Sequence, residues 1–268
     1  MNDAVQASAP ILVDVRDGYR IITLNRPEKL NALDAATHVV LMQALVDAEA
    51  DETCRALLLT GAGRGFCAGA DLSGRSGGGS GAEGRGNAGS SIERTWNPLA
   101  RKLHRLRMPT VCAVNGMAAG AGASIALGCD IVVAGRSAKF LQAFARIGLV
   151  PDCGGTYHLP NLAGQARARG MVMLAEPVPA ETALAWGMIW QVVDDDVLME
   201  TASALAARLA AMPTRALVLA RQALAATAPL DTKLDIERDY QALASQTLDH
   251  REGVAAFLEK RPTKFVGR

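Results

Sequence analysis

This 268-residue sequence contains few aromatic residues, and it has almost no excess of charge of either sign. Phe, Trp and Tyr make up 4% of the residues, and 28 Lys and Arg face 27 Asp and Glu, for a net charge of +1. A protein that binds the nucleic-acid backbone normally presents a basic face, so no nucleic-acid partner is expected. Half of the residues are hydrophobic, which excludes an intrinsically disordered chain.

Paired cysteines are also missing. The five cysteines are odd in number, scattered and without a CxxC pair, which excludes a disulfide framework and a structural zinc site. They indicate reduced, mostly buried thiols in a cytosolic protein, and no metal or redox cofactor is indicated. A nucleophilic Cys153 beside His158 is the competing interpretation.

A basic, apolar leader is absent from the first ten residues, so we expect no secretory signal and a cytoplasmic location. The uncharged stretch 110–129 is long enough to cross a bilayer. It contains Asn115, Ser124 and four glycines, however, and is too weakly apolar. We interpret it as a buried strand, a turn and a helix, and we expect no membrane partner.

The elements along the chain predict an α/β fold. A hairpin is expected over 11–15 and 19–24, a helix over 35–47 capped by Asn31 or Asp34, and buried strands over 55–60, 110–114 and 130–134. From about residue 154 the pattern is almost wholly helical, except at 190–193. We therefore expect an α/β core over 1–195 and a helical C-terminal region over 196–268.

Glycine is concentrated in one part of the chain. Of the 26 glycines, 12 lie between Gly61 and Gly89, and residues 74–89 are half glycine with no periodicity. We interpret 74–89 as a mobile excursion within one domain, because the elements on both sides continue the same alternating pattern.

Two glycine- and alanine-rich segments follow buried strands. Residues 65–72 (GFCAGADL) allow a ligand to approach the backbone closely, and residues 115–123 (NGMAAGAGA) open a helix, where unsatisfied amides favour an anion. Two strand-end loops that each offer an amide are the parts of an oxyanion hole. Taken alone, a glycine- and alanine-rich helix start is more often a sign of tight packing of a helix against a sheet than of catalysis.

A third segment, residues 148–155 (GLVPDCGG), contains Asp152. One interpretation is a helix N-cap. The other is a general acid/base at the mouth of a cleft, whose pKa is raised because Val150, Pro151 and Cys153 remove water from it.

Taken together and in this order, these segments resemble the crotonase (enoyl-CoA hydratase/isomerase) superfamily. The resemblance also includes LNRPEKLNAL near the start and REGVAAFLEKRPTKF at the end, and it covers nearly the whole chain. It implies a ββα spiral core with a helical C-terminal trimerisation region, a homotrimer or homohexamer, and an acyl-CoA thioester substrate whose CoA is the only cofactor-like group.

Residue by residue, the resemblance implies that the backbone amides of Ala68 and Ala121 form the oxyanion hole, with Gly120 as the neighbouring candidate. The substrate would lie along Ala68, Gly69, Ala70 and Asp71. From the residues alone, Asp71 is interpreted as a brace of its loop, and Trp96 as a border of the acyl pocket.

The positions at which this sequence departs from the family pattern indicate which reaction of the family to expect. At the positions where hydratases carry two glutamates this sequence has Ser124 and Phe144, and it has Asp152 where hydratases commonly have glycine. The resemblance therefore implies an isomerase with one catalytic carboxylate, Asp152, and most closely the isomerases that act on ring-epoxidised arylacetyl-CoA thioesters. The alternatives are a fatty-acid Δ3,Δ2-enoyl-CoA isomerase, a dehalogenase and a non-catalytic CoA-binding scaffold.

Overall fold

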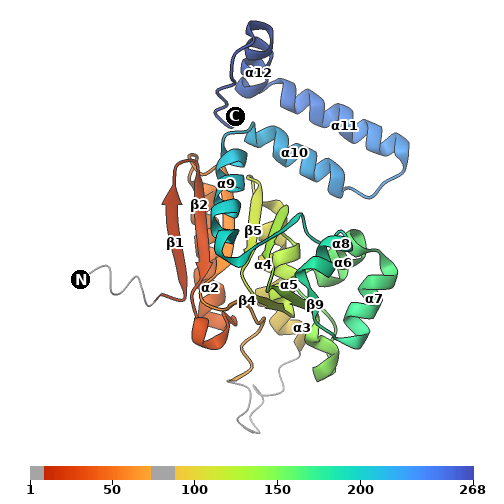
Figure 1. Cartoon of the computed structure of the whole chain (residues 1–268). Coiled ribbons are helices and arrows are strands. Elements are labelled where there is room, and N and C mark those ends of the chain that lie inside the picture. Colours follow the sequence, from red (N-terminus) through yellow and green to blue (C-terminus); the bar gives the residue numbers. More distant parts are fainter. Residues whose placement is uncertain (1–8, 74–87) are drawn as a thin grey trace, which may run out of the picture.

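Two sheets organise the computed structural model, which describes residues 9–73 and 88–268 (Figure 1). The larger sheet has the order β1-β2-β3-β5-β7-β10, with β1 antiparallel to β2 and the other neighbours parallel. Its strands are β1 (Ile11–Arg16), β2 (Tyr19–Leu24), β3 (Ala56–Gly61), β5 (Thr110–Val114), β7 (Ile131–Gly135) and β10 (Gln191–Val193).

The smaller sheet has the order β4-β6-β8-β9, in which only β8 and β9 are antiparallel. Its strands are β4 (Gly65–Cys67), β6 (Met117–Ala119), β8 (Lys139–Leu141) and β9 (Val178–Pro179). Along the chain β3, β5 and β7 are each followed by a strand of the smaller sheet. This alternation makes the ββα spiral that the family resemblance implied.

Helices and short turns connect the strands and form the C-terminal part. The helices are α2 (Ala35–Ala50), α3 (Ala88–Ser91), α4 (Asn97–Arg105), α5 (Ala121–Leu127), α6 (Gly155–Ala163), α7 (Gln165–Leu174), α8 (Ala180–Ala185), α9 (Leu198–Ala210), α10 (Thr214–Ala225), α11 (Leu230–Ser245) and α12 (Leu248–Glu259). The turns are η1 (Pro27–Lys29), η3 (Ile92–Trp96), η4 (Ala143–Ile147) and η5 (Asp195–Val197).

Local chemistry explains the start of α2. The Asp34 carboxylate accepts hydrogen bonds from the backbone amide and the hydroxyl of Thr37, each at 2.8 Å. Of the two expected caps, Asp34 is therefore the one used. Asn31 instead bridges three backbone groups, because it accepts from the amide of Arg26 and donates to the carbonyls of Ala62 and Gly65.

Each face of the larger sheet is covered separately. The main core lies between the sheet, the smaller sheet and helices such as α2, α4 and α5. On the other face α9 contributes Leu198, Ala202 and Ala206, which pack on Leu58 and Val111 of the sheet (Figure 1). Alanine on α9 lets the helix lie close to the strands. By its packing α9 thus belongs with the core, although the expected boundary at residue 195 separates it from that core.

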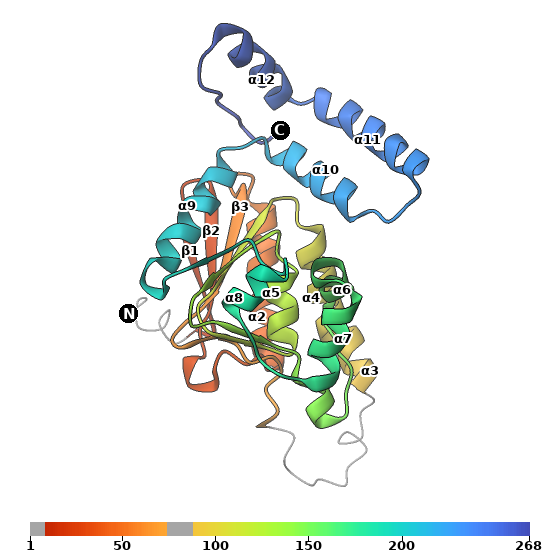
Figure 2. The ribbon, with the colours of Figure 1, turned by 45° about the vertical axis from the view of Figure 1, so that its right-hand side comes forward.

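The remaining C-terminal helices, α10 to α12, extend away from this body (Figure 2). α11 has no buried residue, and Leu224 and Phe257 are each 83% exposed. Within the described ranges no single helix is both long and apolar enough for a membrane span, and α9 with α10 meets that test only as a pair bent by 104°.

Most expected elements lie within a few residues of their predicted positions. The segment 110–129, in particular, contains the expected buried strand and helix, β5 and α5, and the short strand β6 lies between them. The expectation for 74–89 falls outside the described residues except for its last two positions, which begin α3. The short strands β4, β6, β8 and β9 were not predicted. They contain two or three residues each, too few to show a hydrophobic period.

A backbone contact between β4 and α5 yields the first prediction. A methyl group on Gly122 would lie 2.2 Å from the carbonyl oxygen of Cys67, whereas one on Gly170 of α7 would meet nothing within 4 Å. We expect Gly122→Ala to lower the free energy of unfolding by about 3 kcal/mol, because backbone must shift. Gly170→Ala should raise it by about 0.5–1 kcal/mol. Urea unfolding of both variants checks this, and equal midpoints would contradict it.

Candidate active site

The segment after β4 is held by a second piece of backbone. Residues 68–71 pair in parallel with residues 30–33: the amide of Leu33 donates to the carbonyl of Gly69, and the amide of Asp71 donates to the carbonyl of Leu33, at 2.8 and 2.9 Å. In a trans peptide the carbonyl and the following N–H point in opposite directions. Because the Gly69 carbonyl faces residues 30–33, the Ala70 amide points away from them.

This pairing corrects one expectation. The amide of Ala68 donates to the carbonyl of Leu30 at 2.9 Å, so it is not available to a substrate oxygen. The amide of Ala70, two residues on, takes part in no hydrogen bond within the described part of the chain. The amide of this segment that is free to meet a substrate oxygen is therefore that of Ala70, and not that of Ala68 as expected. Sequence reasoning missed the difference because the partner of Ala68 is 38 positions upstream.

The second donor comes from the start of α5. Gly120 precedes the helix, and its amide donates to the carbonyl of Leu141 at 2.8 Å. The alternative donor is thereby excluded. Ala121 opens the helix with its amide unused by any backbone group in the described ranges, as expected for the first turn.

The two loops approach each other closely. A methyl group on Gly69 would lie 2.9 Å from the carbonyl oxygen of Ala119 and 3.3 Å from the nitrogen of Ala121. Only glycine fits there, which explains why this position separates Ala68 from Ala70. The amides of Ala70 and Ala121 thus come from adjacent backbones.

Both alanines border a cavity of about 270 Å³. Its walls are mostly apolar and come from the two loops, η3, η4 and the segment before α6. They consist of Ala68, Ala70, Leu72, Ser91, Ile92, Trp96, Gly120, Ala121, Ala143, Phe144, Arg146, Ile147, Leu149 and Asp152. Trp96 lies at the acyl pocket as expected. Gly69 and Asp71, expected beside the substrate, are absent from these walls.

Asp152 is the carboxylate in this wall. Its Oδ1 atom is buried and has no hydrogen-bond partner among the described residues, and burial raises the pKa of Asp152 to about 6. The N-cap interpretation is wrong, since the cap of α6 is Gly154 and no side chain caps it. A half-buried carboxylate with one buried, unpaired oxygen is costly, so its presence points to chemistry.

Comparison with known proteins agrees with this geometry. The enoyl-CoA hydratase/isomerase family model matches residues 15–268. The chain belongs to the enoyl-CoA hydratase/isomerase family. It is 54% identical to the 1,2-epoxyphenylacetyl-CoA isomerase of Escherichia coli, over 96% of this chain and 98% of that protein. It is 34% identical to the 2,3-dehydroadipyl-CoA hydratase of the same species, over 96% and 99%.

The fold agrees as well. The crystal structure of an enoyl-CoA hydratase from Bacillus anthracis superposes with a TM-score of 0.87 at 30% identity, covering 97% of this chain and all of that one. This enoyl-CoA hydratase/isomerase family member is therefore an enzyme with the crotonase fold.

The two positions that the family resemblance matches to the glutamates of hydratases, Ser124 and Phe144, hold no carboxylate. Ser124 is buried, and its hydroxyl lies 3.4 Å from the Gly120 carbonyl and 3.5 Å from Gln142 Nε2. Phe144 lies in the cavity wall, with its ring 3.6 Å from a methyl position on Gly120. Neither side chain can deprotonate a water molecule.

The nucleophile interpretation of Cys153 finds no support in this family member. The Cys153 side chain is buried, and burial raises the pKa of its thiol, so a thiolate is disfavoured. His158 is partly buried rather than on the surface, and burial lowers its pKa to about 4. It lines a separate hollow between α6 and α10.

From the sequence, Trp186 and Trp190 are both expected to pack within the helical region, and only one of them does. Trp186 packs against the main core, but Trp190 is 67% exposed and packs little. Trp96 sits at the end of the π-helical turn η3, which brings it to the cavity together with Ile92, and its ring meets that of His38 edge-on at 4.1 Å.

The raised pKa of Asp152 predicts a pH-dependent stability difference. The folded chain holds the Asp152 proton up to about pH 6 and the unfolded chain only to about 3.8, so the free energy of unfolding falls as pH rises through this window. We expect Asp152→Asn to be more stable than the parent at pH 8 by on the order of 1 kcal/mol, because water in the cavity screens part of the effect.

The difference between the Asp152→Asn variant and the parent should vanish toward pH 4. Denaturant unfolding of both proteins at pH 4.5, 6 and 8 measures it. A difference that is the same at all three values would contradict this origin.

Proposed function

We propose that this enzyme is an acyl-CoA isomerase that converts 2-(1,2-epoxy-1,2-dihydrophenyl)acetyl-CoA to the oxepin-CoA in phenylacetate degradation. The observation that carries the proposal is Asp152, a half-buried carboxylate whose buried Oδ1 atom has no hydrogen-bond partner among the described residues. It lies in the cavity wall, and the two positions that the resemblance matches to the hydratase glutamates carry no carboxylate. The 54% identity to a 1,2-epoxyphenylacetyl-CoA isomerase supports the choice of substrate.

The proposed reaction combines a ring expansion with a proton shift. In the ring epoxide the bond between the two epoxide carbons breaks as the ring double bonds rearrange, which gives the seven-membered oxepin ring, and the proton shift then moves a double bond into conjugation with the thioester. Asp152 removes a proton from the carbon next to the thioester, and the electron pair moves onto the carbonyl oxygen to form an enolate. The amides of Ala70 and Ala121 donate to that oxygen, whose charge grows during the step. Asp152 then returns the proton to a carbon further along the conjugated system. No atom is gained or lost, so no cofactor is needed beyond the CoA of the substrate.

The pKa of Asp152 suits this shuttle. A carboxylate with an ordinary pKa is too weak a base for an acidified carbon, and one with a much higher pKa would already hold a proton at neutral pH. With a pKa of about 6, Asp152 is mostly ionised at pH 7 and still gains basicity from its burial. Trp96 and Phe144 provide flat apolar surface for a ring.

We also propose that the chain associates as a homotrimer, or as a hexamer of two trimers, through its C-terminal helices. The exposed apolar side chains on α10, α11 and α12 support this, since an isolated soluble chain rarely leaves so many uncovered. They include Leu224, Leu230, Leu234, Phe257 and Leu258.

Removing the carboxylate tests the mechanism. Asp152→Asn keeps the shape of the side chain but cannot accept the proton, so we expect kcat to fall by roughly 10²–10⁴-fold. For the parent, kcat/KM should rise with pH through about 6 and then level off, and the residual activity of the variant should lack this rise. Asp14→Asn, an exposed change on β1, is the control. Near-parental turnover by Asp152→Asn would remove Asp152 from the mechanism.

A substrate comparison separates the proposal from its alternatives. With one preparation, we expect kcat/KM for the ring epoxide to exceed that for a linear Δ3-enoyl-CoA by at least about tenfold, because an aromatic-walled cavity favours a ring. A preference for the linear substrate would favour the Δ3,Δ2-enoyl-CoA isomerase of fatty-acid oxidation. Binding of both thioesters without turnover would favour the non-catalytic scaffold.

A further inference from the structure

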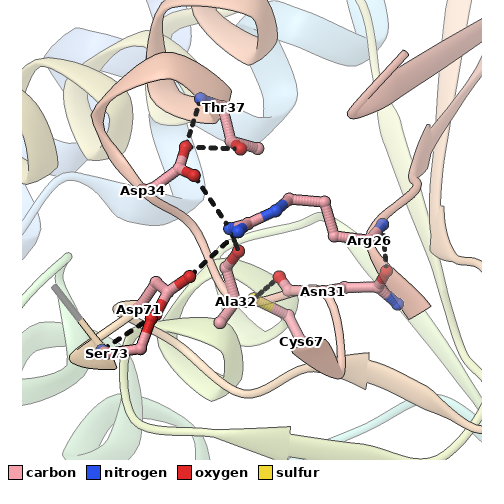
Figure 3. Close-up of polar contacts among 8 residues, drawn as sticks. All are labelled: Arg26, Asn31, Ala32, Asp34, Thr37, Cys67, Asp71 and Ser73. Atoms are coloured by element: carbon pink, nitrogen blue, oxygen red, sulfur yellow. Dashed lines mark hydrogen bonds and ion pairs between the residues drawn. The ribbon is translucent and has the colours of Figure 1, made fainter. Parts of the chain in front are cut away.

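One guanidinium group connects the two backbone segments that orient the Ala70 amide (Figure 3). Arg26 lies two residues after the end of β2. It donates from Nη1 to the carbonyl of Ala32 at 2.6 Å and from Nη2 to Asp71 Oδ2 at 2.9 Å. Nη1 also lies 3.2 Å from Asp34 Oδ2 at the cap of α2. Ala32 belongs to segment 30–33 and Asp71 to segment 68–71, so Arg26 spans the pairing between them.

Asp71 is fixed on both of its oxygens. While Oδ2 accepts from Arg26, Oδ1 accepts from the amide and the hydroxyl of Ser73 at 3.0 and 2.6 Å. The bonds from Ser73, followed by that from Arg26, lower the pKa of Asp71 to about 2. The Asp71 carboxylate is therefore ionised at neutral pH.

Neither side chain touches the cavity. Arg26 and Asp71 are absent from its walls, while Ala70, the residue before Asp71, is part of them. The charged groups are also too well paired to serve the substrate. Whatever they contribute to the reaction must pass through the backbone of residues 68–71.

We propose that Arg26 is a positioning residue: by joining Ala32 to Asp71 it fixes the peptide whose N–H, that of Ala70, points at the thioester oxygen. The inference rests on the proposed function, because it assumes that this oxygen becomes negatively charged in the reaction. An N–H donor that is already oriented needs no reorganisation during the reaction. Making this peptide mobile should therefore weaken the binding of the transition state more than the binding of the substrate.

The chain contains a matched control for this arrangement. Arg20, on the same strand as the residues leading to Arg26, donates from Nη2 to Asp51 Oδ2 at 2.9 Å, and Asp51 Oδ1 accepts from the amide and hydroxyl of Thr53 at 2.9 and 2.6 Å. The Arg20 side chain is 17% exposed and that of Arg26 18%. The Arg20–Asp51 ion pair therefore resembles the Arg26–Asp71 ion pair. It differs in that no residue next to Arg20 or Asp51 lines the cavity, whereas Asp71 follows Ala70.

The experiment compares Arg26→Gln with Arg20→Gln by steady-state kinetics. For Arg26→Gln we expect kcat to fall about 30- to 100-fold while KM changes less than about threefold, because the amide is misdirected but the rest of the substrate still binds. Arg26→Lys keeps the charge but cannot donate from two separate nitrogens to Ala32 and Asp71, so its kcat should lie between that of Arg26→Gln and that of the parent. Arg20→Gln should keep kcat within about twofold of the parent.

A spectroscopic measurement isolates the amide from turnover. Phenylacetyl-CoA has neither an epoxide nor a side-chain alkene, so it can bind without being isomerised. The infrared stretch of its thioester carbonyl moves to lower frequency when hydrogen bonds polarise the carbonyl. We expect the bound ligand to show this downshift in the parent and in Arg20→Gln, and most of it to be lost in Arg26→Gln. If Arg26→Gln does not fold, Asp71→Asn, which keeps an oxygen for Ser73 but loses the charge, should show the same loss.

Two results would overturn the inference. One is a carbonyl frequency in Arg26→Gln equal to that of the parent, and the other is equal kcat losses in Arg26→Gln and Arg20→Gln, which would indicate a purely structural role. Failure of the proposed function looks different. A parent enzyme that polarises the carbonyl of phenylacetyl-CoA but isomerises neither the ring epoxide nor the Δ3-enoyl-CoA would refute that function, and the frequency comparison would still decide the role of Arg26.

Discussion

The close approach of two backbones, one after β4 and one at the start of α5, is the constraint on which the active site depends. The carbonyl of Cys67 leaves no space for a side chain on Gly122, and the carbonyl of Ala119 leaves none on Gly69. Backbone amides can converge on one atom only if their chains can come this near. The small residues of both segments are therefore a geometric requirement of a site built from main-chain donors.

The charged residues near the two loops have two different roles. Arg26 and Asp71 neutralise each other outside the cavity and hold backbone in place. Asp152 stands in the cavity wall with its buried Oδ1 atom unpaired among the described residues, and so keeps the basicity that full pairing would lower. The unpaired oxygen of this carboxylate lowers the stability of the fold. The apolar walls around the carboxylate remove water from it, which raises its pKa and makes it a stronger base.

The sequence allowed much of this to be predicted, for identifiable reasons. Continuous apolar runs marked β3 and β5, and the placement of Asp152 among apolar neighbours correctly predicted a raised pKa. Ala68 was assigned the donor role of Ala70 because the motif alone does not reveal which amides are already bonded. That information lies in Leu30 and Leu33, far upstream, whose carbonyls take up the amides of Ala68 and Asp71. The strands of the smaller sheet were too short to predict, since their hydrogen-bond partners, not their composition, make them strands.

The packing of α9 on the larger sheet has a consequence for the order of folding. Leu198, Ala202 and Ala206 close the second face of that sheet from within the same chain. The second face of the sheet is thus covered without α10 to α12, and the cavity is lined by residues that precede α9 in the sequence. A chain leaving the ribosome can assemble its chemical centre first and expose its apolar helices last, which shortens the time during which they are open to aggregation.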